Sequence, residues 1–235
     1  MVKFGNTIFH YRNFLFPLFY AMLFIPSPPV FSSYVTAIIT GLIIAITGEG
    51  IRGLTIGLVY IIRAGRERRI YAEGLFTSGL YAHCRNPLYI GNIMILLGLG
   101  VVANSLLFLL IFVPLFIFLY QSIVIAEEDF LQQKFGSAYS EYKSNSNRWF
   151  PKTDGLMATI REMDFKWKRV FIEEYNSTYI WMTGAVLLIM KNYYQHEGKD
   201  SFSQNLPLFI AALLFLLLLY FLIRYLKKSG IWKGD

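Results

Sequence analysis

Long stretches without a charged side chain constrain this chain more than any other feature. Residues 88–126 contain no Asp, Glu, Lys or Arg, and residues 206–223 are almost entirely apolar. A helix of roughly 20 apolar residues crosses the hydrocarbon core of a bilayer, which is about 30 Å thick. Hydrophobic residues make up 55% of the chain and charged residues 16%, as expected for a protein that contacts lipid. We therefore predict an integral membrane protein of the all-α class.

The apolar stretches predict a polytopic membrane helix bundle with about six transmembrane helices. Residues 88–126 are too long for one crossing, and the polar pair Asn104-Ser105 near their middle suits a tight turn between two helices. Residues 13–48 are interrupted at Pro26, Pro28 and Pro29, which cannot continue a helix, so they also provide two spans. The last two spans are expected at about residues 178–190 and 206–223.

The distribution of lysine and arginine predicts the orientation in the membrane. These residues occur at Lys3 and Arg12 and within residues 63–85, 134–169 and 224–233, whereas the turns between them carry almost none. Short loops rich in positive charge stay cytoplasmic, so both termini are expected on the cytoplasmic side. The net charge of +7 reflects this topology and attraction to anionic lipid headgroups, and no folded basic domain supports nucleic-acid binding.

Three local features of the sequence bear on whether the chain binds a dinucleotide or a metal or carries a buried ion pair. The segment from Gly48 to Gly53 has the spelling of a dinucleotide-binding fingerprint, but no strand is expected before it, which favours close helix packing. Glu49 and Arg52 share one helix face and form either a structural pair or part of a site, since ionisable groups are costly at membrane depth. Cys84 is the only cysteine and there are three histidines, so no metal site is expected.

Two polar segments flank the apolar hairpin of residues 88–126. The first, residues 78–91, concentrates hydrogen-bonding side chains, and the second, residues 127–151, begins with two adjacent glutamates. A hairpin that crosses the bilayer and returns places both segments on one membrane face, where they can form one site. Glu127 and Glu128 point about 100° apart on a helix, so one can bind a ligand while the other is paired or solvated. A belt of Tyr and Arg anchors at the membrane surface is the alternative explanation of the first segment.

The order of residues in these segments resembles a family of membrane-embedded methyltransferases that use S-adenosylmethionine. This family includes isoprenylcysteine carboxyl methyltransferase and phospholipid N-methyltransferases. Its pattern is similar to Gly79-Leu80-Tyr81, Arg85-Asn86-Pro87, Tyr89 and Gly91, followed by Glu127-Glu128, Phe135-Gly136, Tyr139, Tyr142 and Arg148-Trp149-Phe150-Pro151. Leu80 replaces the usual proline. Asn86 stands where the eukaryotic prenylcysteine enzymes have His, as in many bacterial members, and this does not favour a prenylcysteine substrate.

The resemblance implies a cytoplasmic-face cofactor site and methyl transfer from S-adenosylmethionine to a lipophilic acceptor. That acceptor would be an isoprenoid carboxylate, a phospholipid amine or another long-chain substrate. Glu127 or Glu128 would hold the ammonium group or ribose hydroxyls of the cofactor, and Arg85 or His83 its carboxylate. The implied cofactor-binding residues are Tyr81, His83, Arg85, Asn86, Pro87, Tyr89, Gly91, Glu127, Glu128, Tyr139 and Tyr142. The implied catalytic residues are Arg85, Glu128 and Arg148, the last of which would orient an acidic substrate group.

Two other classes of function stay open. Membrane sterol reductases resemble the same C-terminal pattern and use NADPH, whose phosphate could bind Arg63, Arg66, Arg68 and Arg69. A scaffold or transporter that keeps the fold without a cofactor is the other alternative.

The resemblance covers residues 48–151 and divides the chain into three parts. Residues 1–151 are the expected methyltransferase core. Residues 152–177 are expected to form an interfacial cytoplasmic linker helix or, alternatively, a lid over the site. Residues 178–235 are expected to hold two additional transmembrane helices. The similarity to bacterial members implies location in a prokaryotic inner (plasma) membrane, and the distribution of lysine and arginine implies that both termini are cytoplasmic.

Overall fold

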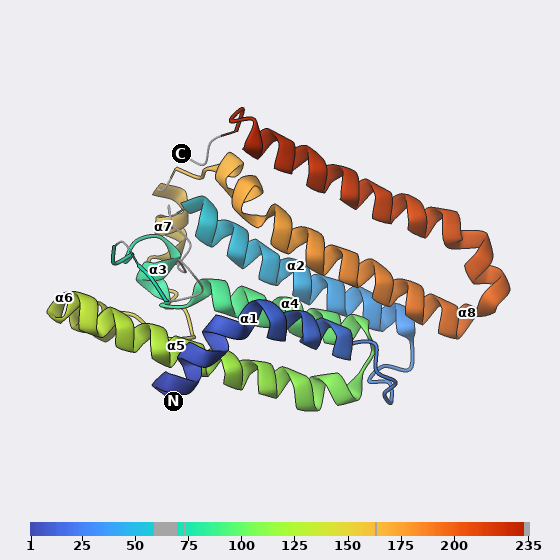
Figure 1. Cartoon of the computed structure of the whole chain (residues 1–235), viewed down its shortest axis with the longest axis horizontal. Coiled ribbons are helices and arrows are strands. Elements are labelled where there is room, and N and C mark those ends of the chain that lie inside the picture. Colours follow the sequence, from blue (N-terminus) through green and yellow to red (C-terminus); the bar gives the residue numbers. More distant parts are fainter. Residues whose placement is uncertain (59–69, 73, 163, 233–235) are drawn as a thin grey trace.

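A computed structural model of the chain describes residues 1–58, 70–72, 74–162 and 164–232. Within these residues the chain is helical, with one isolated β-bridge between Cys84 and Asn147, which confirms the predicted all-α class. The elements are α1 (Val2–Met22), α2 (Tyr34–Leu58), α3 (Leu80–His83), α4 (Pro87–Val102), the π-helical turn η1 (Phe108–Phe112), α5 (Val113–Phe135), α6 (Ser137–Asn145), α7 (Leu156–Glu162) and α8 (Trp167–Lys228). Figure 1 shows the long helices lying side by side as a bundle.

Three of the described helical segments are long and apolar enough to cross a membrane. They are α2, the continuous segment Phe108–Phe135 and the 62-residue α8, while α4 is a shorter apolar helix. Helix α8 is interrupted at Gly198, where a φ of 79° reverses the chain, and Figure 1 shows its two arms running antiparallel. The two spans predicted near the C-terminus therefore lie in separate arms of α8.

Helices α2 and α4 approach each other closely through two pairs of glycines. A Cβ atom added to Gly41 would lie 2.5 Å from the carbonyl oxygen of Gly98, and one added to Gly48 would lie 2.7 Å from that of Gly91. Both pairs are seven residues apart on antiparallel helices, so a single seam of small residues brings the backbones together. The predicted role of Gly48 in helix packing, rather than in a dinucleotide fold, is confirmed.

Asn104 organises the turns at the end of the bundle opposite the two polar segments. Its φ is 51°, and it follows the end of α4 as the sequence predicts for a tight turn. Its Oδ1 accepts hydrogen bonds of 2.9 Å from the amides of both Val30 and Phe31, and its Nδ2 donates to the carbonyl of Phe31 at 2.9 Å. One side chain thus fastens the proline-rich α1–α2 connection to the α4–α5 turn.

An aromatic layer fills the contact between α1 and α5. Phe19 packs against Phe116 with ring centroids 5.2 Å apart, and Phe16 lies 5.1 Å from Phe116 and 5.2 Å from Tyr120. This layer belongs to the main buried core. Near the N-terminus, a Cβ atom added to Gly5 would lie 2.0 Å from the carbonyl oxygen of Ser122, so α1 also meets α5 backbone to backbone.

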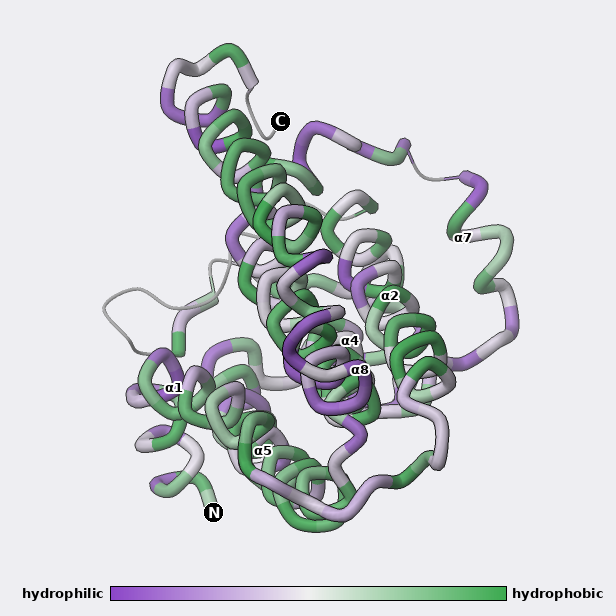
Figure 2. The backbone as a smooth tube through the Cα atoms, turned by 90° about the vertical axis from the view of Figure 1, so that its right-hand side faces the viewer, coloured by the Kyte–Doolittle hydropathy of each residue, from purple (hydrophilic) through white to green (hydrophobic). Residues whose placement is uncertain are grey.

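The two arms of α8 have different surroundings. The first arm packs against α2 and α4, whereas Figures 1 and 2 show the second arm as a largely hydrophobic helix at the edge of the bundle. Tyr220 of the second arm lies 5.3 Å from Tyr175 and 4.8 Å from Tyr179 of the first, between ring centroids. Many apolar side chains of the second arm, such as Leu214 and Leu218, remain exposed in the protein, as expected for a surface that faces lipid.

One end of the bundle gathers the polar segments. Figure 1 shows α3, α6, α7, the N-terminus and the end of α8 at one end, and the turn of α8 near Gly198 at the other. Residues 152–177, predicted to be one interfacial linker helix, comprise α7 and the first turns of α8. Their position relative to a membrane surface stays a prediction.

Candidate functional site

The first polar segment makes a sharp turn that leads into α4. Gly79 has a φ of 60°, the single turn α3 follows, and Cys84 is extended before Pro87 opens α4 as predicted. The extended part pairs with the second polar segment, since the amide of Arg85 donates to the carbonyl of Asn147 at 2.8 Å. Asn86 reinforces the pairing by donating from Nδ2 to the carbonyl of Arg148 at 3.1 Å.

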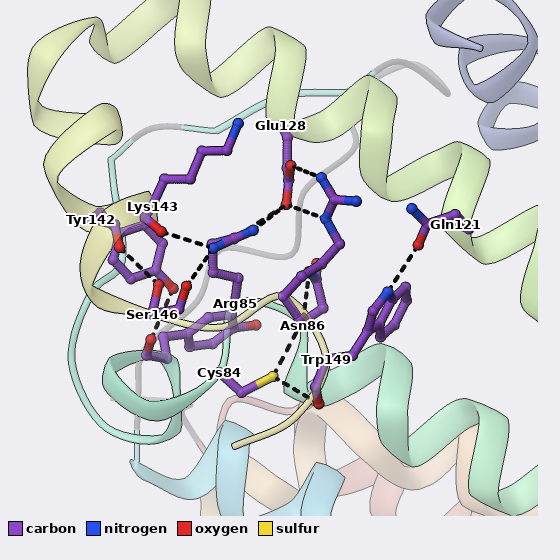
Figure 3. Close-up of polar contacts among 11 residues, drawn as sticks. Cys84, Arg85, Asn86, Gln121, Glu128, Tyr142, Lys143, Ser146 and Trp149 are labelled. Carbon is purple, nitrogen blue, oxygen red and sulfur yellow. Dashed lines mark hydrogen bonds and ion pairs between the residues drawn. The ribbon is translucent and has the colours of Figure 1, made fainter. Parts of the chain in front are cut away.

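Glu128 joins the two polar segments through a pair of guanidinium groups (Figure 3). Arg148 donates from Nε to Oε1 at 3.0 Å and from Nη2 to Oε2 at 2.7 Å, and Arg85 donates from Nε to Oε1 at 3.1 Å. Glu128 is 8% exposed, so this charged group is held away from bulk solvent. The Glu128 carboxylate raises the pKa of Arg148 through hydrogen bonding and charge attraction. Two positive charges against one negative leave this cluster with a formal excess of one positive charge.

The two arginines differ in how many donors are committed. Arg85 also donates from Nη1 to the backbone carbonyls of Lys143 and Ser146, so its donors are turned inward (Figure 3). The side chain of Arg148 is 32% exposed, and among the described residues its Nη1 makes no hydrogen bond. Arg85 therefore connects the two segments, while Nη1 of Arg148 is uncommitted among the described residues, and binding of an acidic group by Arg148 stays a prediction.

Glu127 points to another part of the bundle, as expected for a helical neighbour of Glu128. Its Oε1 accepts a 2.7 Å hydrogen bond from the hydroxyl of Tyr89 on α4. Within the described residues this is the one hydrogen bond to its carboxylate. Glu128 is thus the more extensively paired of the two glutamates, and ligand binding by Glu127 stays a prediction.

The tyrosines of the site connect the helical turn α3 to helix α6. Tyr142 donates from its hydroxyl to the carbonyl of Tyr81 at 2.9 Å, and the rings of Tyr139 and Tyr142 lie 6.1 Å apart. Burial raises the pKa of Tyr142 to about 12 and also raises the pKa values of Tyr81 and Tyr139. These side chains are therefore neutral hydrogen-bonding groups near neutral pH.

Two other predicted site residues have structural partners away from Glu128. Both ring nitrogens of His83 are engaged, with Nδ1 3.0 Å from the carbonyl of Lys152 and Nε2 2.9 Å from the hydroxyl of Thr159 on α7. Gly91 lies in the seam between α2 and α4, where an added Cβ would come 2.5 Å from Cγ of Arg52. Cofactor contacts by His83 and Gly91 stay predictions, and the contacts just described give each a packing role.

Sequence reasoning did not identify several groups that build the site. The carbonyls of Lys143, Ser146 and Asn147 hold Arg85, and Trp149 donates from Nε1 to Oε1 of Gln121 at 2.8 Å. Every residue has a backbone carbonyl, so the sequence does not indicate which carbonyls accept a hydrogen bond. That depends on the path of the folded chain. The arginines proposed for NADPH, from Arg63 to Arg69, lie outside the described residues.

A hollow of about 470 Å³ lies between α1 and α5. Phe9, Ile70 and Phe130 provide apolar walls, and the polar lining includes His10 and Asp129. The remaining lining residues are Asn6, Ala126 and Gln133. None of them belongs to the Glu128 cluster, although Ala126 and Asp129 immediately flank the glutamate pair in the chain.

Residues 35–138 match the family model of the phospholipid methyltransferases. This confirms the resemblance to the membrane methyltransferase family over α2 to α5, including Arg85, Glu127 and Glu128. Arg148 and α8 lie beyond the matched residues.

Two curated proteins are similar to part of the chain. The cobalt-zinc-cadmium resistance protein CzcN of Cupriavidus metallidurans is 32% identical over 107 residues, which cover 42% of this chain and 49% of that protein. The nickel-cobalt-cadmium resistance protein NccN of Alcaligenes xylosoxydans xylosoxydans is 28% identical over 107 residues, or 42% and 50% of the two chains. The chain thus matches about half the length of these relatives. No solved structure matches it.

Proposed function

From the match of residues 35–138 to the phospholipid methyltransferase family, we propose that this protein is an integral-membrane methyltransferase. It would move a methyl group from S-adenosylmethionine to a lipophilic acceptor at the cytoplasmic face. The observation that carries the proposal is the Glu128 cluster, in which Arg85 and Arg148 join the two polar segments.

The side chains at this site suit the charges of S-adenosylmethionine. The cofactor would supply an activated methyl group on a sulfonium, together with an ammonium and a carboxylate group. Glu127, with one oxygen engaged by Tyr89, fits the cationic part, and Nη1 of Arg148 fits the carboxylate. Arg148 could instead orient an acidic group of the acceptor.

Methyl transfer from a sulfonium needs alignment more than acid-base chemistry. Orientation can supply about 7–11 kcal/mol of a reaction barrier, and the rigid clamp around Glu128 would serve that purpose. A carboxylate acceptor is already nucleophilic at neutral pH, whereas an amine or phenol would need a base. We assign Arg85 and Glu128 to positioning the site and Glu127 to cofactor binding.

The acceptor is proposed to be a membrane lipid or another isoprenoid or long-chain molecule. The hollow between α1 and α5 is lined both by apolar side chains and by the polar side chains of His10 and Asp129, which suits an amphipathic substrate. Six spans, with both arms of α8 crossing the bilayer and both termini cytoplasmic, form part of the proposal, as does location in a prokaryotic inner membrane. The names of the two relatives concern metal resistance, so this chain could contribute to metal resistance by modifying membrane lipids.

Calorimetric titration of the detergent-purified protein with S-adenosylhomocysteine, and separately with NADPH, tests the proposed cofactor. We expect saturable binding of S-adenosylhomocysteine that is weakened in Glu127→Gln. The matched control is Glu141→Gln, because Glu141 is an exposed glutamate on the neighbouring helix α6 and lies in neither the Glu128 cluster nor the lining of the hollow. Binding of NADPH alone would favour a reductase, and binding of neither ligand by folded protein would favour a scaffold or transporter.

Incubation of membranes with radioactive S-adenosylmethionine tests the acceptor class. We expect label in the organic extract of membranes that contain the protein and none above background with the Glu127→Gln variant. Label confined to the aqueous phase would contradict a lipophilic acceptor.

A further inference from the structure

A second cluster of ionisable side chains lies within the bundle, away from Glu128. Arg52 of α2 donates to Glu174 of α8 from Nε to Oε2 at 3.1 Å and from Nη2 to both oxygens at 2.9 and 2.6 Å. The two residues are 5% and 2% exposed. Burying such a pair among apolar helices is costly, and a buried ion pair does not by itself imply added stability. The cluster therefore calls for a role beyond holding two helices together.

Arg52 fixes the orientation of an amide on α4. Its Nη1 donates to Oδ1 of Asn92. Because a guanidinium group has donors only, the amide must turn its oxygen toward Arg52 and its nitrogen away. That nitrogen donates to the hydroxyl oxygen of Tyr120 on α5 at 2.8 Å. Arg52 is thus connected to the Tyr120 hydroxyl through the Asn92 amide.

Tyr120 borders the tyrosine that holds Glu127. The rings of Tyr89 and Tyr120 lie 4.7 Å apart, at an interplanar angle of 42°. Tyr120 is 2% exposed and is confined on another side by Phe116, whose ring centroid is 4.6 Å away. A shift of Tyr120 would therefore press on Tyr89, whose hydroxyl donates to Glu127 at 2.7 Å.

We propose that Glu174 is a positioning residue for Glu127 and acts through Arg52, Asn92, Tyr120 and Tyr89. This inference rests on the proposed function, because it takes Glu127 as a cofactor-binding residue. It gives a role to the first arm of α8, which lies outside the family match yet contributes the carboxylate at the start of the chain of contacts. The first arm of α8 is then part of the working site.

Replacing Glu174 by Gln keeps the side-chain shape and removes its charge. Arg52 would keep Glu49, whose Oε2 lies 4.0 Å from its Nε, as a nearby carboxylate, and would move toward it and away from Asn92. We expect S-adenosylhomocysteine to bind about fivefold more weakly or worse, within the usual range of coupling between distant sites. Glu174→Asp should restore part of the affinity.

The matched control is Glu173→Gln, one residue earlier on the same helix. Glu173 pairs with Lys227 of the second arm at 3.4 Å and does not contact Arg52. We expect it to bind S-adenosylhomocysteine as the wild type does. If Glu174→Gln fails to fold, Asn92→Leu provides the test, since it breaks the connection while leaving the Arg52–Glu174 pair in place.

A double-mutant cycle distinguishes positioning from simple stabilisation. If Glu174 acts through Tyr89, combining Glu174→Gln with Tyr89→Phe should weaken binding little beyond the worse single variant. Additive losses, or wild-type affinity in folded Glu174→Gln and Asn92→Leu, would overturn the inference while leaving the proposed function intact. Absence of S-adenosylhomocysteine binding in the wild type would instead overturn the proposed function and this inference with it.

Discussion

Glu128 is the residue on which the candidate site depends most directly, because its buried carboxylate is the shared counter-charge of two guanidinium groups. Replacing it by Ala would leave Arg85, whose side chain is 10% exposed, without a counter-charge. Breaking a buried pair in this way costs about 3–5 kcal/mol, and the partial exposure of Arg148 places our expectation at about 3 kcal/mol. Thermal unfolding in detergent measures this loss.

Asp129→Asn is the control for that measurement. Asp129 is adjacent to Glu128, but within the described residues its side chain accepts a single hydrogen bond, from Gln133 at 2.8 Å, so the free energy of unfolding should change by no more than about 0.5 kcal/mol. Equal stability of the two variants would contradict the importance of the clamp.

Cys84 offers a probe of the turn between α3 and α4. Its thiol lies near the carbonyls of Arg148 and Trp149, the residue is 1% exposed, and burial raises the pKa of the thiol. An unfolded thiol ionises near pH 8.5. Between that pH and the higher pKa of the folded state the unfolded chain loses its proton first, so this group's contribution to stability falls as pH rises.

The expected outcome is slow alkylation of Cys84 in the native protein from pH 7 to pH 9 and rapid alkylation in denaturing detergent. Mass spectrometry of the alkylated protein follows both rates. Since Cys84 is the only cysteine, no second site obscures the signal. Rapid native labelling at pH 7 would show that the turn is not closed as described.

At the scale of elements, the glycine seam between α2 and α4 sets the spacing on which the site rests. A Cβ atom added to Gly98 would lie 2.6 Å from both the amide nitrogen of Ala45 and the carbonyl oxygen of Gly41. Backbone atoms cannot move aside as side chains do, so Gly98→Ala should force the helices apart and cost about 1–3 kcal/mol. Thermal unfolding in one detergent measures the change.

Gly50→Ala is the matched variant on α2. Nothing lies within 4 Å of its added Cβ, so the better helix propensity of alanine should stabilise the protein by up to about 1 kcal/mol. A loss of stability in Gly98→Ala together with a gain in Gly50→Ala would support the glycine seam between α2 and α4. A change in the free energy of unfolding in the same direction for both variants would contradict it.

Element boundaries followed the sequence where a residue has one dominant backbone preference. Pro87 opens α4, and Asn104 forms the turn after it. The reversal within α8 lies between the two predicted spans, but its position at Gly198 was not marked, since glycine occurs 18 times in this chain. The partners of Glu49 and Arg52 also required the structure, because Thr178, Trp181 and Glu174 all come from α8, more than a hundred residues away.

At the scale of the whole molecule, the two ends of the bundle should lie on opposite sides of the membrane. We expect Ser144→Cys, beside the candidate site, to react with a membrane-impermeant maleimide only after cells are permeabilised. Asp200→Cys, near the turn of α8, should react in intact cells. Both positions are exposed, while the native Cys84 is buried and gives little background. Reaction of both variants in intact cells would contradict the proposed orientation.

The sequence by itself determined the helical class and the association with a membrane, because long apolar runs leave the backbone little choice but to satisfy its hydrogen bonds internally. It also indicated both polar segments, since the hairpin of residues 88–126 returns them to one face. Only the tertiary structure decided how the residues are paired. Glu128 and Glu127 are identical in type and adjacent in sequence, yet their 100° separation on α5 directs one to two arginines and the other to Tyr89. Such partners depend on how neighbouring helices are rotated and spaced, which the packing of the whole bundle sets.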